Sequence, residues 1–192
     1  MTTWIAELGR KAIHVSFLGV ALAYYYGAPK EVVRDILLAA TVVSIGVELL
    51  RLHEPRFRSY FKQFFGGLIR RHEKRALLGS TYMLIAALIS VEVFSVPICT
   101  AALGTLILGD AAAALVGRRV GRIHLFGGKK TLEGTLAFVA VAFLFSWGLV
   151  QLPWHVALVG AAVGAVFEWL PIPLDDNFRI PMAAGFAMKF LT

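Results

Sequence analysis

The sequence is poor in the residues that build disulfides and zinc sites. It has one cysteine, Cys99, in 192 residues, which excludes an internal disulfide and leaves no Cys/His cluster for a structural zinc ion. Charged residues are also scarce, at 16%. The Gly-Gly-Lys-Lys-Thr segment at residues 127–131 lacks the leading glycine and the preceding strand of a P-loop. These absences exclude a disulfide-stabilised fold, a cysteine-based zinc site and a Walker-type nucleotide site.

Apolar residues dominate instead. The chain is 58% hydrophobic and its mean hydropathy is +0.74, well above the values of ordinary globular proteins. One domain of this length has no core large enough to bury so much apolar surface. The sequence therefore predicts a polytopic integral membrane protein with a single domain over residues 1–192. Residues 1–9 show no signal-peptide layout, so we expect the first apolar run to be retained as a span.

Apolar runs recur along the whole chain. A helix needs about 20 apolar residues to cross a bilayer, and six runs approach that length, followed by a half-length run that is either a tilted seventh helix or a re-entrant segment. The runs lie at residues 12–28, 33–50, 77–91, 96–116, 132–150, 154–170 and 180–191. The predicted fold is an all-α bundle of six to seven transmembrane helices.

Basic residues are concentrated in alternate connections. The N-terminus and the connections at 51–75, 117–131 and 171–179 together hold 16 of the 19 Lys and Arg residues. By the positive-inside rule these segments face the cytosol. The net charge of +7 is thereby explained by membrane topology and anionic headgroups, and no nucleic-acid partner is expected.

The connection at residues 52–75 alternates aromatic and basic residues at helical spacing, which predicts an amphipathic helix in the headgroup region. We expect this helix to anchor the connection, and a lipid-entry gate is the alternative. The apolar positions are Phe57, Tyr60, Phe61, Phe64, Phe65 and Leu68, and the basic ones are Arg56, Arg58, Lys62, Arg70 and Arg71.

Residues 109–134 combine an acid, glycines and lysines between two apolar runs. Asp110 follows an apolar segment, where a charged residue indicates function. It is expected to bind Mg²⁺ or to act as a general base, and an ion pair with Arg118 or Arg119 is the structural alternative. Lys129 and Lys130 precede the next run, where lysines and a helix N-terminus favour an anion; as the alternative they only mark the cytosolic side. The stretch predicts a nucleotide-phosphate site at the mouth of a membrane protein.

The residues around these lysines have structural interpretations too. Thr131 is expected to be the N-cap of the following helix, with Glu133 favourable in its first turn. Glu133 could alternatively help Asp110 to hold a metal. The spacing of Gly117 and Gly121 is typical of close helix packing.

Other polar residues are predicted at the same face. His14 is either a packed interfacial histidine or a base for a hydroxyl group. Asp175-Asp176-Asn177 is either a solvated turn or a further source of Mg²⁺ ligands. Glu48 and Glu168 lie at helix ends, where ion pairs with Arg51 or with loop arginines are expected. The remaining candidates are Glu73 and Asn177.

At this point the pattern resembles a known family, the CTP-dependent lipid kinases, which comprise dolichol and polyprenol kinases, phytol kinases and CTP-using diacylglycerol kinases. The run Gly-Asp-Ala-Ala-Ala-Ala-Leu-Val-Gly-Arg-Arg-Val-Gly at 109–121, followed by Lys-Thr-Leu-Glu-Gly at 130–134, is similar to the signature of this family. Three shorter segments resemble its other motifs in the same order. They are Arg10-Lys11-x-x-His14, Glu73 with Gly79-Ser-Thr-Tyr82, and Asp175-Asp176-Asn177 with Ile180-Pro181.

The resemblance implies transfer of the γ-phosphoryl group of CTP to a lipid hydroxyl with the help of a divalent cation such as Mg²⁺. A polyprenol- or dolichol-type alcohol is the favoured acceptor, with phytol, geranylgeraniol or diacylglycerol as alternatives. Asp110 and Gly117 match the catalytic element of the family. The chemistry of the residues adds His14 and Asp176 to Asp110 as catalytic candidates, and Asp110, Glu133, Asp175 and Asp176 as candidate metal ligands. The implied nucleotide-binding residues are Arg10, Lys11, Gly117, Gly121, Lys129, Lys130, Thr131, Glu133 and Gly134.

Two rival hypotheses remain at this stage. A CDP-lipid synthase would use CTP at a comparable face and release pyrophosphate. A small transporter would carry ionisable groups deep in its spans, and the sequence has none there. The expected partners are CTP, the lipid alcohol and the bilayer, with a homo-oligomer as an open alternative.

Overall fold

The computed structural model of this chain describes residues 4–67, 69, 73, 76–125, 130–170 and 172–192, with side chains described from residue 14 onward. The described part is helical, and its only β-type pairing is an isolated bridge between His124 and Thr131. The predicted all-α fold is therefore confirmed. The helices are α1 (Trp4–Tyr25), α2 (Lys30–His53), α3 (Pro55–Phe65), α4 (Gly79–Val93), α5 (Val96–Gly104), α6 (Asp110–Val120), α7 (Leu132–Leu144), α8 (Trp154–Trp169) and α9 (Asp176–Lys189), with π-helical segments η2 (Thr105–Gly109) and η4 (Phe145–Leu149).

Each predicted apolar run lies largely within a helix, although fewer of these helices satisfy the length of a membrane span than predicted. Within the described residues, two continuous helical segments are long and apolar enough to cross a membrane, Val96–Val120 and Leu132–Leu149. The runs at His14–Tyr25, Gly79–Val93 and Trp154–Trp169 form shorter apolar helices. These findings are consistent with membrane association, and the count of six to seven spans stays a prediction.

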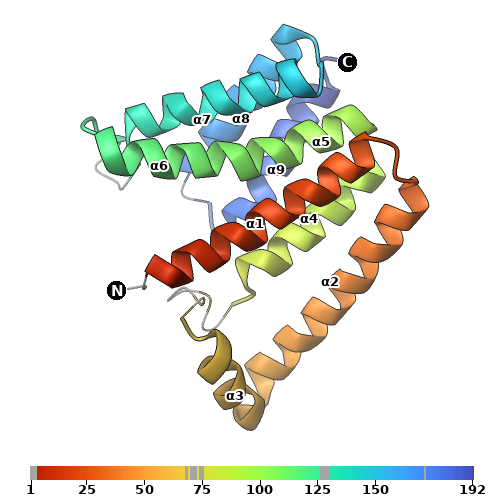
Figure 1. Cartoon of the computed structure of the whole chain (residues 1–192), viewed down its shortest axis with the longest axis vertical. Helices are drawn as coiled ribbons and strands as arrows, with labels where there is room; N and C mark the ends of the chain where they lie inside the picture. Colours follow the sequence, from red (N-terminus) through yellow and green to blue (C-terminus); the bar gives the residue numbers. More distant parts are fainter. Residues whose placement is uncertain (1–3, 68, 70–72, 74–75, 126–129, 171) are drawn as a thin grey trace.

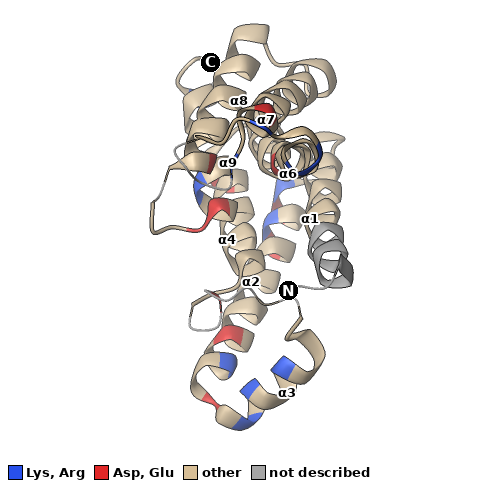
Figure 2. Cartoon of the chain, turned by 90° about the vertical axis from the view of Figure 1, so that its left-hand side faces the viewer, with Lys and Arg blue, Asp and Glu red and all other residues tan. Residues whose placement is uncertain are grey.

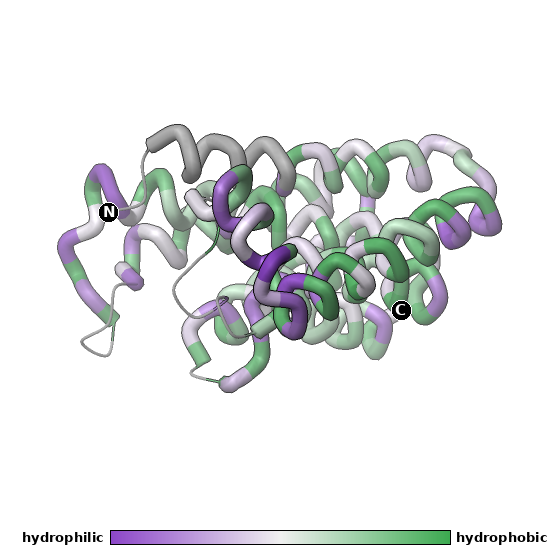
Figure 3. The backbone as a smooth tube through the Cα atoms, turned by 90° about the horizontal axis from the view of Figure 1, so that it is seen from below, coloured by the Kyte–Doolittle hydropathy of each residue, from purple (hydrophilic) through white to green (hydrophobic). Residues whose placement is uncertain are grey.

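Exposed apolar side chains support the same conclusion. α2 lies along one edge of the molecule (Figure 1) and leaves Ile36, Val42, Val43 and Leu49 more than half exposed. Patches of this kind mark contact with a membrane or a partner. Figure 3 shows hydrophobic and neutral colour along much of the helices, and hydrophilic segments mostly near their ends.

Two of the connections rich in basic residues lie at one end of the helices, and the third, which contains α3, stands apart. In Figure 1 the start of α1 and the described parts of the α6–α7 and α8–α9 connections lie towards the left and α3 lies at the bottom, whereas the α1–α2 and α7–α8 connections and the C-terminus lie towards the right and top. Figure 2 views the left-hand end and shows acidic and basic residues around α6 and α9, with a separate group on α2 and α3. Which end faces the cytosol stays a prediction.

The predicted amphipathic helix is α3, which begins with Pro55 at its first position, where proline's fixed φ suits a helix start. It buries none of its residues. Phe57, Phe61 and Phe65 follow one another along the helix, with ring centroids 6.1 and 5.0 Å apart. The apolar stripe expected of an interfacial helix is therefore present, and its place at the headgroups stays a prediction.

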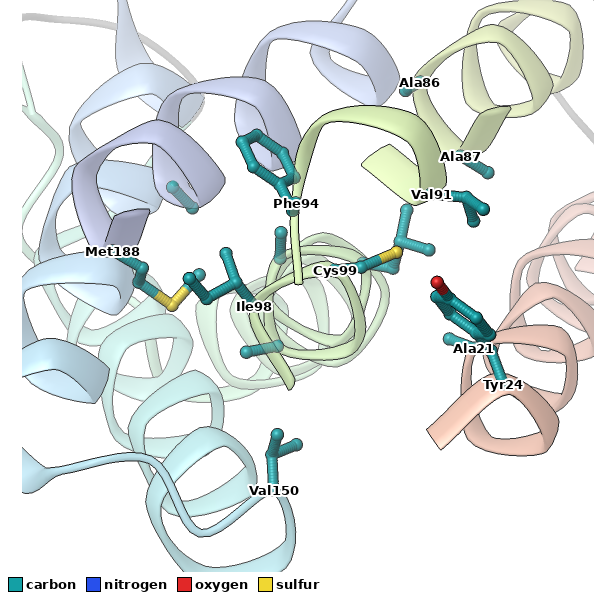
Figure 4. Close-up of a cluster of buried hydrophobic side chains, with 14 of the residues drawn as sticks. Ala21, Tyr24, Ala86, Ala87, Val91, Phe94, Ile98, Cys99, Val150 and Met188 are labelled. Carbon is teal, nitrogen blue, oxygen red and sulfur yellow. The ribbon is translucent and has the colours of Figure 1, made fainter. Parts of the chain in front are cut away.

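The central helix α5 is almost wholly buried because small residues allow its neighbours to approach closely. Figure 4 shows Cys99 near Tyr24 of α1 and Val91 of α4, with Ile98 and Met188 further along the same cluster. Cys99 is fully buried and free, as expected for a small apolar residue. A second cluster surrounds the fully buried Phe138 of α7 and lies next to the π-helical segment that precedes Asp110.

The contact between Gly109 and Phe138 gives a prediction about stability. A Cβ atom at Gly109 would lie 2.8 Å from two atoms of the Phe138 ring, which cannot move freely because Phe138 is fully buried. Gly109→Ala is therefore expected to destabilise the protein by about 1–3 kcal/mol. The measurement is thermal unfolding of the purified protein in detergent.

Gly46→Ala is the matched control for this prediction. Gly46 lies within α2, and a Cβ atom there would meet nothing within 4 Å. Alanine is favoured over glycine inside a helix by roughly 0.5–1 kcal/mol, so this variant is expected to unfold at an equal or higher temperature. Equal unfolding temperatures for Gly109→Ala and the wild type would contradict the packing at Phe138.

Candidate functional site

A cleft of about 260 Å³ opens where α6, α7 and α8 meet. Its walls carry two acids and two bases among small and hydroxyl-bearing residues, which leaves room for a polar ligand. The lining residues are Asp110, Ala113, Ala114, Gly117, Arg118, Lys130, Thr131, Gly134, Thr135 and Glu168. Five of the residues predicted for catalysis or nucleotide binding, namely Asp110, Gly117, Lys130, Thr131 and Gly134, thus line one cleft together with the candidate Glu168.

Asp110 enters the cleft from the middle of a long helical rod. Helices α5 and α6 run continuously from Val96 to Val120 through the π-helical segment at Thr105–Gly109, so Asp110 lies well before the end of the rod. A π-helical turn holds an extra residue and frequently occurs at functional sites. No hydrogen bond or ion pair within the described part of the chain involves the half-buried Asp110 carboxylate. The alternative of an ion pair with Arg118 or Arg119 is therefore not supported.

Lys130 and Glu168 form an ion pair across the cleft. Glu168 lies near the end of α8 and is only 3% exposed, whereas the Lys130 side chain is 42% exposed. The expected partner of Glu168, Arg51 or a loop arginine, was wrong, because a lysine of the α6–α7 connection takes that place. Glu168 Oε1 accepts from Lys130, and Oε2 is buried without any hydrogen-bond partner.

Two further acids lie near this ion pair. Asp110 of α6 lines the same cleft, and Asp176 of α9 is near enough to the Glu168 carboxylate for a weak charge interaction, although it is not among the lining residues. Asp110, Lys130 and Asp176 therefore share one neighbourhood, although 66 residues separate the first from the last. Asp176 itself stands in the first turn of α9.

Glycines and a threonine bring α6 and α7 into contact beside the cleft. Thr131 is the N-cap of α7, as predicted, and its Oγ1 accepts from the Gly134 N–H at 3.2 Å. A Cβ at Gly117 would lie 2.9 Å from Thr131 Oγ1, and one at Gly134 would lie 2.9 Å from the Ala113 carbonyl oxygen. At Gly121 a Cβ would lie 2.7 Å from both Thr131 Oγ1 and Cγ2. The expected close packing at Gly117 and Gly121 is confirmed.

Glu133 stands in the first turn of α7, as predicted, and the alternative role as a metal ligand finds no support among the described residues. Its carboxylate accepts from the backbone N–H groups of Arg122 and Ile123, at 3.0 and 3.3 Å. It does not line the cleft. Glu133 therefore holds the connection after α6 in place.

The motif at the start of α9 is mainly a helix cap. Asp175 is the N-cap, and its Oδ1 accepts from the backbone and side-chain nitrogens of Asn177, at 3.0 and 2.7 Å. Asn177 is 2% exposed and lies against Gly79, where a Cβ would come within 2.6 Å of its Nδ2. Asp175 and Asn177 thus dock the start of α9 on the start of α4.

A buried polar network attaches the start of α4 to α2. The Glu48–Arg51 ion pair is confirmed, with side chains only 1% and 3% exposed. Arg51 also donates to the carbonyl oxygens of Glu73 and Ala76. Glu48 Oε1 accepts from the Leu78 N–H at 2.7 Å, and Glu73 Oε1 accepts from the Gly79 N–H at 3.0 Å. Glu48 and Glu73 therefore stabilise the contact between α2 and the start of α4, and neither residue lines the cleft.

Some predicted residues are not located at the site. The side chains of Arg10 and Lys11 and the whole of Lys129 lie outside the described residues. His14 is half-buried on α1 and is not among the lining residues of the cleft. Its predicted role as a base stays a prediction.

The described side chains offer few protein ligands for a divalent cation. Among them there is no group of three or more His, Cys, Asp or Glu residues that could hold a metal ion, so the predicted set of Asp110, Glu133, Asp175 and Asp176 is not brought together. Mg²⁺, however, commonly uses only one or two carboxylates together with substrate phosphates. Asp110 and Glu168 are two carboxylate residues that line the cleft, and the buried Oε2 atom of Glu168 has no hydrogen-bond partner.

Four lining residues, Ala113, Ala114, Arg118 and Thr135, were not predicted for the site, and two of them, Arg118 and Thr135, are polar. Thr135 lies one turn after Thr131, and its hydroxyl donates to the Thr131 carbonyl oxygen at 3.1 Å. Residues four apart lie on the same face of a helix, so the spacing of Thr131 and Thr135 could have indicated that both line the site. Arg118 donates from Nε to the Ala114 carbonyl oxygen at 3.0 Å along its own helix.

Comparisons with known proteins agree with this arrangement. The chain is 30% identical to phytol kinase of Synechocystis, over 94% of this chain and 77% of that protein. It is 25% identical to CTP-dependent diacylglycerol kinase 1 of Saccharomyces cerevisiae, over 95% of this chain and 72% of that protein. It is 35% identical to dolichol kinase of the same yeast, over 44% of this chain and 18% of that protein.

No protein-family model and no solved structure matches the chain. The relatives named above are kinases of different lipid alcohols, and the similarity to the first two covers nearly the whole chain. Asp110, Lys130, Thr131 and Gly134, on which the resemblance mainly depends, line one cleft. The chain belongs to the family of CTP-dependent lipid kinases.

Proposed function

We propose that this protein transfers the γ-phosphoryl group of CTP to the hydroxyl group of a membrane lipid, with a polyprenol- or dolichol-type isoprenoid alcohol as the favoured acceptor. Residues 1–192 form the single kinase domain, and the cleft faces the cytosol, where CTP is available. The observation that carries the proposal is the meeting of Asp110, Lys130 and Glu168 in one cleft beside apolar helices.

The cleft has the components that phosphoryl transfer requires. This reaction depends mainly on positioning and on neutralising phosphate charge. Lys130 and Arg118 supply positive charge at the cleft wall, and Lys129, Arg10 and Lys11 are the further candidates for phosphate binding. Gly117 and Gly134 let α6 and the start of α7 approach each other closely, which brings Asp110 and Lys130 to the same cleft.

The acids have two proposed tasks. Asp110, with Asp176 nearby, would hold the divalent cation, which neutralises phosphate charge when bound. A carboxylate of this pair or His14 would accept the proton of the lipid hydroxyl. The lipid would reach the cleft between apolar helices and keep its chain in the bilayer.

Labelled nucleotides test this function and separate it from a CDP-lipid synthase. Purified protein is incubated with CTP labelled in the γ- or the α-phosphate, and with γ-labelled ATP, against polyprenol, dolichol, phytol, geranylgeraniol and diacylglycerol. We expect label in the lipid from γ-labelled CTP and none from α-labelled CTP. Transfer of the α-label would instead indicate a cytidylyltransferase.

The acceptor panel tests the finer proposal. The highest kcat/KM is expected with a long isoprenoid alcohol, and a higher value with diacylglycerol or phytol would overturn that part of the proposal only. Label transfer to none of the lipids would overturn the kinase assignment itself. A transporter would show solute flux in liposomes without nucleotide turnover.

A further inference from the structure

Glu168 is buried more deeply than an ordinary surface acid and is incompletely satisfied. It is the only Asp or Glu in the apolar helix α8, and its Oε2 atom has no hydrogen-bond partner. A buried carboxylate without full compensation is costly. Because Glu168 lines the same cleft as Asp110, we expect its carboxylate to bind a ligand there.

The cleft wall carries equal numbers of acidic and basic side chains. The acids suit the cation of a metal–nucleotide complex, and the bases suit its phosphates. Asp110 and Glu168 contribute two negative charges at the wall, and Arg118 and Lys130 contribute two positive charges. A nucleoside triphosphate needs cations for its phosphates, whereas its divalent cation needs carboxylate oxygens. The ion pair between Lys130 and Glu168 Oε1 joins one member of each set, so opening it would free Lys130 for the phosphates and both carboxylate oxygens of Glu168 for the cation.

We propose that Glu168 and Asp110 together bind one divalent cation. In the ligand-free protein Lys130 forms an ion pair with Glu168, and when the ligands bind Lys130 moves from Glu168 to the nucleotide phosphates. This inference rests on the proposed function, since it assigns the cation site of the same cleft. Lys130 is well suited to the exchange, because its side chain is 42% exposed and it lies in the connection that leads into α7. Glu168 is fixed on its helix and stays in place.

The exchange predicts opposite effects for the two partners of the ion pair. Removing the ammonium group leaves Glu168 free for the cation, whereas removing the carboxylate deletes a ligand. We expect Lys130→Met to bind Mn²⁺ roughly tenfold more tightly than the wild type, and Glu168→Gln to bind it roughly 10- to 100-fold more weakly. The Lys130→Met/Glu168→Gln double variant is expected to bind as weakly as Glu168→Gln alone.

The experiment titrates the purified full-length protein in detergent with Mn²⁺ alone, and follows free Mn²⁺ by electron paramagnetic resonance. Glu92→Gln is the matched control, because Glu92 is an acid of α4 in an exposed ion pair with Lys30. It is expected to bind Mn²⁺ as the wild type does. Thermal unfolding without Mn²⁺ shows whether each variant is folded.

A purely structural ion pair would give a different result. Lys130→Met would then lower the unfolding temperature without tightening Mn²⁺ binding, and this outcome would overturn the proposal, as would unchanged binding by Glu168→Gln. If Glu168→Gln failed to fold, the Mn²⁺ affinity of Lys130→Met would still test the proposal, because only the exchange predicts tighter binding by this variant. Failure of the proposed function is distinguishable, since it appears as absent lipid labelling in the wild type, whatever the Mn²⁺ titration shows.

Discussion

Replacing Asp110 with asparagine is expected to lower the kcat of label transfer from CTP to lipid by about 10³-fold. Asparagine keeps the shape of the side chain but removes the negative charge that would hold a cation or accept a proton. Asp110 is half-buried in the cleft, and no hydrogen bond or ion pair with another described residue ties its carboxylate to the fold. Its replacement should therefore cost activity and little stability.

The control for this prediction is Asp35→Asn. Asp35 lies in α2 and pairs with the neighbouring Arg34 at 2.9 Å, and its side chain is 64% exposed. The control is expected to retain the wild-type kcat. Activity is measured with γ-labelled CTP and the best acceptor of the panel, and thermal unfolding of both variants is compared. An Asp110→Asn variant that turns over like the wild type would remove Asp110 from the reaction.

Replacing Arg51 with methionine is expected to destabilise the protein by about 3–5 kcal/mol. Methionine fills much of the space but leaves the Glu48 carboxylate, only 1% exposed, without its cation. The carbonyl oxygens of Glu73 and Ala76 lose a donor as well. A buried charge without its partner carries the full cost of desolvation, so the effect should exceed that of ordinary core substitutions.

Arg34→Met provides the comparison, because the Arg34–Asp35 pair is exposed. Exposed pairs are screened by water and contribute little to stability, so this variant should unfold nearly as the wild type does. Both are measured by thermal unfolding in the same detergent. A loss of stability in Arg51→Met no larger than that in Arg34→Met would show that the network at α2 and α4 does not hold the fold together.

The network also links stability to the site. Arg51 donates to the carbonyl oxygens of Glu73 and Ala76, and Glu48 accepts from the Leu78 N–H. Glu73 in turn accepts from the Gly79 N–H, and Gly79 lies against Asn177. Through these contacts α2 supports the start of α9, where Asp176 lies. The sequence pairs Glu48 with Arg51 by their spacing, but the connection to Asn177 depends on contacts between distant segments.

Much of the fold was predictable because apolar runs and basic connections are local properties of the sequence. The runs at 96–116 and 132–150 became the two longest apolar helical segments, and Thr131 caps α7 as its position before an apolar run indicated. The π-helical segment before Asp110 was not predicted. A single extra residue in a turn depends on packing against neighbours such as Phe138, and no sequence period reports it.

The sequence by itself determined an all-helical chain, the position of its basic residues between the apolar runs and the residue types of a phosphate site, because helix formation and charge distribution follow from neighbouring residues. Only the tertiary structure decided which acid faces which base. It paired Glu168 with Lys130, turned Glu133 to the backbone after α6 and used Asp175 as a cap. These choices depend on how α6, α7, α8 and α9 cross, and the glycines and buried rings at their contacts set those crossings.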